Sequence, residues 1–105
     1  MDIQLRRGLL DYCVLGVLKE EETYGYNIIK KMDSILPISE STLYPILKRL
    51  ETKKMVRSHS VEYNGRLRKY YQITAVGIES LNDFIDSWQE VDQVYQYIKG
   101  VVSND

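Results

Sequence analysis

The 105-residue sequence predicts a mainly α-helical fold with one small β-hairpin. Three observations support this fold class. Apolar residues recur at helical spacing in four segments, and two short alternating segments flank the dipeptide Asn64-Gly65. The last helical segment also keeps a seven-residue apolar repeat. A chain of this length is expected to form one domain with a modest core.

Residues 5–19 are expected to form the first helix. Its apolar residues leave almost no polar face: Leu5, Leu9, Leu10, Tyr12, Cys13, Val14, Leu15, Val17 and Leu18. A helix that is apolar on every side is normally covered on every side. Because one small domain covers only one side, we expect a second copy of the chain to cover the other.

Two further helices should follow. The spacing predicts one over residues 24–35, with Thr23 as its N-cap and Pro37 after its end. It predicts the next over about residues 40–53, capped by Ser39.

A hairpin is expected next. Residues 56–63 and 66–73 alternate as strands do, and Asn-Gly between two strands is a strong signal for a tight turn. Thr74 should then cap a long helix that runs to about Ile98.

The long helix carries an apolar seam at alternating steps of three and four: Leu81, Phe84, Trp88, Val91, Tyr95, Ile98 and Val102. Such a seam is typical of helices that pair along their length. The alternative is an amphipathic helix lying on its own domain, but a core of this size is too small to cover a helix roughly 35 Å long. We therefore predict a homodimer whose interface contains Leu9, Leu81, Phe84, Trp88, Val91, Tyr95 and Ile98.

Charge is distributed unevenly along the chain. The formal net charge is −1, but residues 48–69 hold eight Lys and Arg against Glu51 and Glu62, a local charge of +6. Residues 78–105 carry a local −5. Steering of a partner depends on the local field, so the central segment could still attract an anionic polymer.

A short helix with a polar start followed by a basic hairpin is typical of a winged helix-turn-helix, which places a helix in the DNA major groove. Residues 1–74 are therefore predicted to be a winged helix-turn-helix DNA-binding domain, and residues 75–105 a C-terminal dimerisation helix. The residues expected to meet double-stranded DNA are Ser39, Ser41, Thr42, Tyr44 and Lys48 on the helix, and Asn64, Arg66 and Arg68 on the hairpin.

Each of these assignments has a plainer alternative. Ser39 could be only a helix cap, Tyr44 could be a core residue, and the hairpin could be an ordinary surface element. Arg49, offset from Lys48, could pair with Glu51 or Glu62 instead of contacting DNA. A protein-interaction module that has the winged-helix fold but does not read DNA is the competing function.

Other function classes find little support. One His (His59), one Cys (Cys13) and no glycine-rich phosphate loop argue against an enzyme, a metal site or a cofactor. No run of about 18 apolar residues is present to span a membrane, and the first residues lack an export signal. Together with the single cysteine, this indicates a cytoplasmic protein.

Four stretches together resemble the PadR family of bacterial transcription regulators. They are Gly8-Leu9-Leu10-Asp11, Tyr24-Gly25-Tyr26-Asn27-Ile28, the run Ser41-Thr42-Leu43-Tyr44-Pro45 continuing to Glu51, and Gly65-Arg66 through Lys69-Tyr70-Tyr71-Gln72-Ile73-Thr74 with Gly77. The resemblance implies a homodimer joined through the C-terminal helix that represses transcription at a palindromic operator. Members often have Gly where this chain has Ser41, and Lys-Gly-Leu where it has Lys53-Lys54-Met55. Lys54 therefore occupies a position where the left-handed conformation would favour Gly.

The resemblance also implies a ligand, because some relatives bind planar aromatic molecules at the dimer interface. Trp88 lies in the middle of the seam, and Tyr12 and Phe84 could line the same space. Two Trp88 side chains near a two-fold axis could stack on a flat guest. Trp88 could instead be only a large interface anchor. We therefore predict a homodimeric repressor released by a small aromatic effector.

Overall fold

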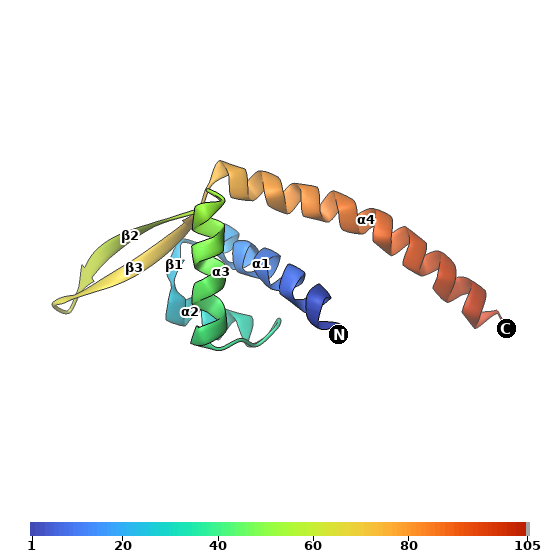
Figure 1. The fold of residues 1–105 in the computed structure, drawn as a ribbon, viewed down its shortest axis with the longest axis horizontal. Helices are drawn as coiled ribbons and strands as arrows, with labels where there is room; N and C mark the ends of the chain where they lie inside the picture. The colour runs from blue at the N-terminus through green and yellow to red at the C-terminus, as the bar shows by residue number, and fades with distance from the viewer. Residues whose placement is uncertain (105) are drawn as a thin grey trace.

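The structure is a computed structural model that describes residues 1–104. Its elements in chain order are α1 (Ile3–Glu20), β1 (Thr23–Tyr24), α2 (Gly25–Met32), α3 (Glu40–Thr52), β2 (Val56–Tyr63), β3 (Arg66–Ile73) and α4 (Ala75–Ser103) (Figure 1). The hairpin and α4 project in opposite directions from the packed helices, which gives a molecule of 65 × 26 × 21 Å. The predicted fold class, helices with a small hairpin and a long last helix, is confirmed.

The core lies where α1, α2 and α3 meet the base of the hairpin. Its largest fully buried side chains come from those three helices: Val14, Leu15, Val17, Ile28, Met32, Leu43, Leu47 and Leu50. Val56 and Tyr71 close the core from the two long strands. The apolar faces predicted for the first three helices therefore pack against one another.

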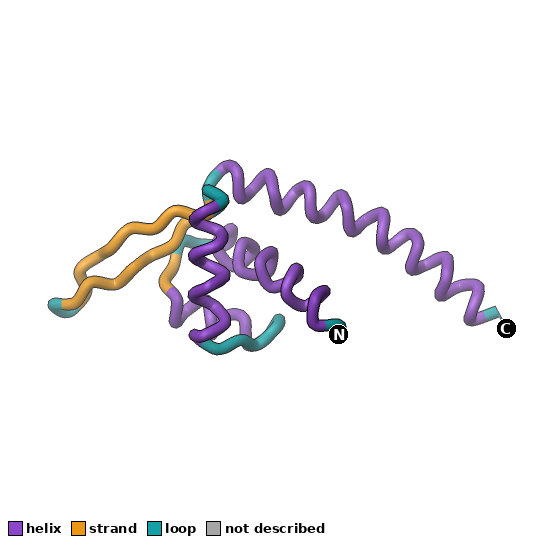
Figure 2. Tube along the Cα trace, viewed as in Figure 1, coloured by secondary structure: helices purple, strands orange, loops and turns teal. Residues whose placement is uncertain are grey.

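The hairpin belongs to a three-stranded antiparallel sheet in the order β1-β3-β2. Its turn has positive φ at both Asn64 (50°) and Gly65 (77°), as the Asn-Gly dipeptide predicted. β1 contributes only Thr23 and Tyr24, which pair with Tyr71 and Tyr70. Beyond those pairs the hairpin is a two-stranded ribbon (Figure 2).

The predicted start of the second helix is wrong. Thr23 is a strand residue only 4% exposed, and its hydroxyl accepts a hydrogen bond from Asn27 at 2.9 Å. Tyr24 is the N-cap of α2, without a side-chain cap. The helix also ends at Met32 rather than residue 35, because the chain turns there and the Ile35 N–H donates to the Met32 carbonyl.

The other two predicted N-caps, Ser39 and Thr74, differ in their hydrogen bonds. Ser39 occupies the N-cap position of α3 but makes no side-chain cap bond, whereas the Thr74 hydroxyl accepts from the Gly77 N–H at 3.2 Å and caps α4. α4 then continues to Ser103, five residues past its predicted end at Ile98. No helix among residues 1–104 is long and apolar enough to cross a membrane.

A compact junction joins the end of α3 to the start of α4. Lys54 adopts φ +62°, so α3 ends in the left-handed conformation that Gly would favour. Thr74 crosses to this turn: its hydroxyl donates to the Lys54 carbonyl at 2.7 Å, and its N–H donates to the Met55 carbonyl at 2.9 Å. Gly77 lies so close that a Cβ there would overlap the Met55 carbonyl oxygen. The junction fixes the direction in which α4 leaves the domain.

Candidate nucleic-acid interface

The N-terminal end of α3 presents a cluster of exposed hydroxyls. The Ser39 hydroxyl shares hydrogen bonds with those of Ser41 (2.9 Å) and Thr42 (3.4 Å) instead of capping the helix backbone. The first N–H groups of a helix lack partners within it. This end of α3 therefore offers hydroxyls and backbone donors suited to base edges or phosphate oxygens.

Tyr44 and Lys48 continue this exposed surface of α3, one turn apart. Tyr44 is 46% exposed, so it is not a core residue. Its hydroxyl nevertheless lies over the start of α2, because a Cβ added at Gly25 would sit 2.6 Å from the Tyr44 hydroxyl oxygen. The glycine of the Tyr-Gly-Tyr stretch therefore gives Tyr44 the space it occupies.

The hairpin residues predicted to meet DNA fall into two environments. Asn64 and Arg66 are exposed at the turn. Arg68 is half-buried, and its guanidinium carbon lies 4.1 Å from the ring centroids of both Tyr24 and Tyr63. Neither tyrosine was predicted as a functional residue, since only the strand register reveals that they flank Arg68.

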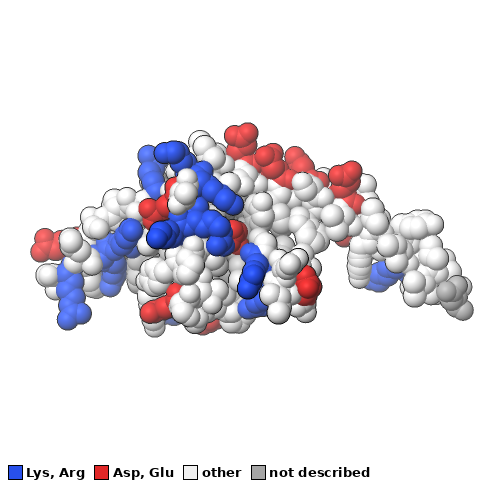
Figure 3. Space-filling view, in the orientation of Figure 1, with Lys and Arg blue, Asp and Glu red and all other residues white. Residues whose placement is uncertain are grey.

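Basic side chains gather over the end of α3 and the hairpin, and acidic ones line one edge of α4 (Figure 3). Within residues 1–104, five exposed cations of α3, of the turn after it and of the hairpin make no ion pair: Lys48, Lys53, Lys54, Arg57 and Arg66. We call these five residues the basic face.

Arg49 does not belong to the basic face. Its Nε donates to the Asp11 carboxylate at 3.1 Å, and this hydrogen bond raises the pKa of the Arg49 guanidinium. The alternative partners Glu51 and Glu62 are therefore wrong. Glu51 instead lies 3.7 Å from Lys69.

The structure also defines the surroundings of His59 and Cys13, the two residues considered for catalysis or metal binding. His59 Nε2 lies 2.8 Å from the Glu22 carboxylate, and its ring stacks on Tyr70. Burial raises the pKa of the Cys13 thiol, which disfavours a nucleophilic thiolate. Residues 1–104 contain no cluster of His, Cys, Asp or Glu that could hold a metal ion.

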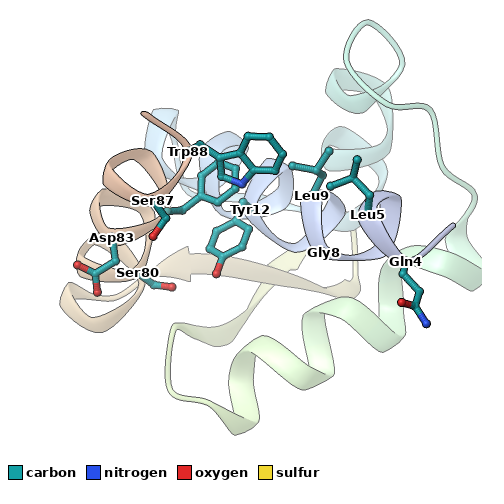
Figure 4. A pocket seen from close by; sticks show the side chains of 10 residues that line it. Gln4, Leu5, Gly8, Leu9, Tyr12, Ser80, Asp83, Ser87 and Trp88 are labelled. Atoms are coloured by element: carbon teal, nitrogen blue, oxygen red, sulfur yellow. The ribbon is translucent and has the colours of Figure 1, made fainter. Parts of the chain in front are cut away.

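A cleft of about 460 Å³ lies between α1 and the first half of α4 (Figure 4). The structure brings together the three aromatic residues predicted for a ligand. The rings of Tyr12 and Phe84 stack at 4.2 Å, and Phe84 lies 6.0 Å from Trp88. The sequence did not predict that Leu5 and Asp83 also line this cleft, because their positions depend on how α1 and α4 cross.

The seven residues predicted for the dimer interface fall into two groups according to their burial in the protomer. Leu9, Leu81 and Phe84 are half-buried, and Phe84 stacks on α1 of the same chain. The other four are exposed: Trp88 (37%), which borders the cleft, and Val91 (47%), Tyr95 (49%) and Ile98 (54%) beyond it. The start of α4 therefore lies on its own domain, as the amphipathic-helix alternative expected, and the rest of the seam is exposed to solvent.

Comparison with known proteins identifies the family. Residues 14–83 match the model of the "Transcriptional regulator PadR-like family". An uncharacterised protein of Lysinibacillus sphaericus is 33% identical over 93 residues, which cover 84% of this chain and 85% of the relative. The X-ray structure of a PadR-like transcription factor from Bacteroides fragilis is 36% identical with a TM-score of 0.82, and the match covers 90% of this chain and 94% of that one.

A second similar structure is that of Bacillus subtilis PadR in complex with operator DNA. It is 26% identical with a TM-score of 0.69, and the match covers 73% of this chain and 46% of that one. The family consists of DNA-binding regulators, not enzymes. With its matching sequence, its winged helix and its long last helix, the chain belongs to the PadR-like family of transcriptional regulators.

Proposed function

We propose that the chain is a homodimeric repressor that binds a palindromic operator and is released from it by a small aromatic effector. The observation that carries the DNA-binding part is the exposed hydroxyl start of α3 together with the basic face, whose first cation, Lys48, lies on the same helix. α3 would enter the major groove by its first turn, with Ser39, Ser41, Thr42, Tyr44 and Lys48 toward the bases and phosphates. The hairpin, which we call the wing, would lie on the neighbouring backbone through the exposed Asn64 and Arg66, with Arg68 behind them in the same interface. Such a regulator acts in the cytoplasm, where bacterial DNA lies.

A salt titration tests whether the chain reads DNA. The protein would first select duplexes from a random-sequence pool, and its affinity for the selected duplex would then be measured against salt concentration. Contacts with several phosphates should give a linear log–log decline with a slope of about −0.9 per phosphate. A winged-helix module without DNA readout would enrich no sequence and show no such slope.

The open seam of α4 supports the dimer. Trp88, Val91, Tyr95 and Ile98 are apolar, exposed and aligned on one side of the helix. Pairing of two such helices would bury this stripe and hold two copies of α3 apart, as two half-sites about 34 Å apart require. Sedimentation at micromolar concentration tests this step, because a lone protomer would contradict it.

The aromatic cleft supports an effector site. Tyr12, Phe84 and Trp88 line a cleft whose two walls, α1 and α4, belong to one protomer, and a second copy could cover its mouth over a flat guest. Such a guest would release DNA only if it bound the DNA-competent arrangement less tightly than the alternative arrangement.

Trp88 provides the assay, since it is the only tryptophan in the sequence. A planar aromatic that binds here should quench Trp88 fluorescence and weaken binding to the selected duplex over the same concentration range. Tyr12→Ala should weaken both effects together. Failure of every planar aromatic tried to quench Trp88 would favour the plainer role of this residue as an interface anchor.

A further inference from the structure

Arg68 makes an unusual set of contacts for a residue on an exposed hairpin. Its guanidinium carbon is 4.1 Å from the centroid of the Tyr24 ring and 4.1 Å from that of the Tyr63 ring. Tyr24 also meets Tyr70 edge-on at 5.5 Å. We call Tyr24, Tyr63 and Arg68 the arginine clamp. Its three members come from three different strands.

The strand register explains why these residues meet. Tyr63 is opposite Arg66 and Tyr24 is opposite Tyr70, so Arg68 is the diagonal neighbour of both tyrosines on β3. Side chains two residues apart on a strand share a face, and diagonal neighbours lie within reach of aromatic and long side chains. The clamp therefore follows from the register and would be lost if the wing shifted by one residue.

The clamp lies where the wing most needs support. β1 pairs with β3 only at Tyr70 and Tyr71, and outward of these pairs the wing has two strands. A two-stranded hairpin is marginal on its own in water. Through Arg68, the clamp connects Tyr63 near the turn to Tyr24 at the base, so it braces the unsupported part of the ribbon.

The same residues connect the wing to α3. Tyr24 immediately precedes Gly25, which lies beneath the hydroxyl of Tyr44 on α3. A continuous set of contacts thus runs from the turn of the wing, through the clamp and the start of α2, to the helix proposed to enter the major groove. Movement of the wing relative to α3 would have to break one of these contacts.

We infer that Arg68 is a positioning residue for DNA binding, which fixes the angle of the wing while the exposed Arg66 contacts the phosphates. The inference rests on the proposed DNA-binding function. Arginine suits this role better than lysine, because its planar guanidinium stacks on aromatic faces and lysine offers only a compact charge. A phosphate contact by Arg68, in contrast, would depend chiefly on its positive charge.

The first test needs no DNA. In the free protein, ring currents from two tyrosines should shift the NMR signals of the Arg68 side chain upfield, and Tyr63→Leu should reduce that shift. Thermal unfolding of the same variant serves as the control for folding. A folded Tyr63→Leu chain with unchanged Arg68 signals would overturn the clamp.

The second test separates positioning from charge by the salt dependence of affinity for the selected duplex. Arg68→Gln, Arg68→Lys and Tyr63→Leu should each weaken binding about 3- to 30-fold with the log–log slope unchanged. The double variant Arg68→Gln/Tyr63→Leu should bind the duplex no more weakly than the single variant with the lower affinity, since both changes remove the same contact. Arg66→Gln is the matched control and should reduce the slope by about 0.9.

Opposite results would overturn the inference. One is that Arg68→Gln or Arg68→Lys binds the duplex as tightly as the wild-type chain. Another is that Arg68→Gln reduces the log–log slope by about 0.9. A third is that the losses of affinity of the two single variants add up in the double variant. A wild-type chain that binds no duplex would remove the proposed function and this role with it. Normal wild-type binding with any of the opposite results would remove only the role of Arg68.

Discussion

Lys54 holds a backbone conformation that its side chain disfavours. Its φ of +62° ends α3, and the Met55 N–H closes the turn by donating to the Leu50 carbonyl at 3.0 Å. For a residue with a Cβ, the left-handed conformation is less stable than the right-handed one by roughly 1–2 kcal/mol. The surrounding hydrogen bonds therefore hold Lys54 in place against its own preference.

Lys54→Gly should consequently stabilise the chain, by about 1 kcal/mol in the free energy of unfolding, since part of the gain is offset by the greater freedom of Gly in the unfolded state. Denaturant unfolding followed by circular dichroism would measure this. Lys53→Gly is the control: Lys53 has φ −81°, so the same change there should destabilise the chain or leave it unchanged. Equal effects at both positions would contradict the strain at Lys54.

Gly77 gives a second prediction at the same junction. Gly77→Ala should lower the free energy of unfolding by about 1–3 kcal/mol, because the new methyl group would press on the Met55 carbonyl. Gly100 is also in α4, but a Cβ added there would meet nothing within 4 Å, so Gly100→Ala should raise stability by up to about 1 kcal/mol. Thermal unfolding of both variants would show opposite shifts, and shifts of the same sign would refute the close approach at Gly77.

Single residues also show what the sequence could and could not predict about the site. Helical spacing was enough to place Tyr44 and Lys48 together on the exposed surface of α3. It could not show that Arg49 pairs with Asp11, a residue 38 positions away on another helix. The environment of Arg68 was likewise hidden, because the clamp depends on the pairing of β1 with β3.

At the scale of elements, the four helices and the hairpin were predictable because each carries its own periodicity, cap or turn signal. β1 was missed since two residues are too few to show alternation, and it forms only because β3 offers its edge. The end of α4 was underestimated, because the helix continues through Gly100 to Ser103.

The open half of α4 yields a prediction about assembly. Ile98→Asp should raise the dimer dissociation constant by about 100-fold or more, because the carboxylate would be buried in the seam of both copies. Gln93→Asp is the matched control, since Gln93 is exposed and lies off the seam. Sedimentation velocity over a dilution series would measure both. A similar dissociation constant for the two variants would argue against pairing through this stripe.

At the scale of the whole molecule, charge is separated along the 65 Å length. The basic face lies around α3 and the wing, and acidic side chains line one edge of α4 (Figure 3). The exposed acidic residues of α4 include Glu79, Asp86 and Glu90. A net charge of −1 therefore conceals a dipolar protein whose two regions interact oppositely with DNA.

Neutralising the acidic edge should speed the encounter with DNA. The triple variant Glu79→Gln/Asp86→Asn/Glu90→Gln should associate with a duplex about two- to tenfold faster at low salt, since fewer charges repel the phosphates. The gain should vanish near 0.15 M salt, where the screening length is about 8 Å. Stopped-flow fluorescence at both salt concentrations would measure the rates. A gain of equal size in both conditions would point to a cause other than the long-range field.

The exposure of every described residue from Ile85 onward has a further consequence for the cell. Beyond Trp88, which still borders α1, α4 has little of its own domain to pack on, and such a helical segment is only marginally stable in water, so it should unwind when a chain is alone and rewind on meeting its partner. Unwound single chains would be cut by proteases at this tail, whereas paired chains would be protected. Under the proposed pairing, newly made chains would survive best once their concentration is high enough for dimers to form. The abundance of the regulator would therefore rise steeply above that concentration.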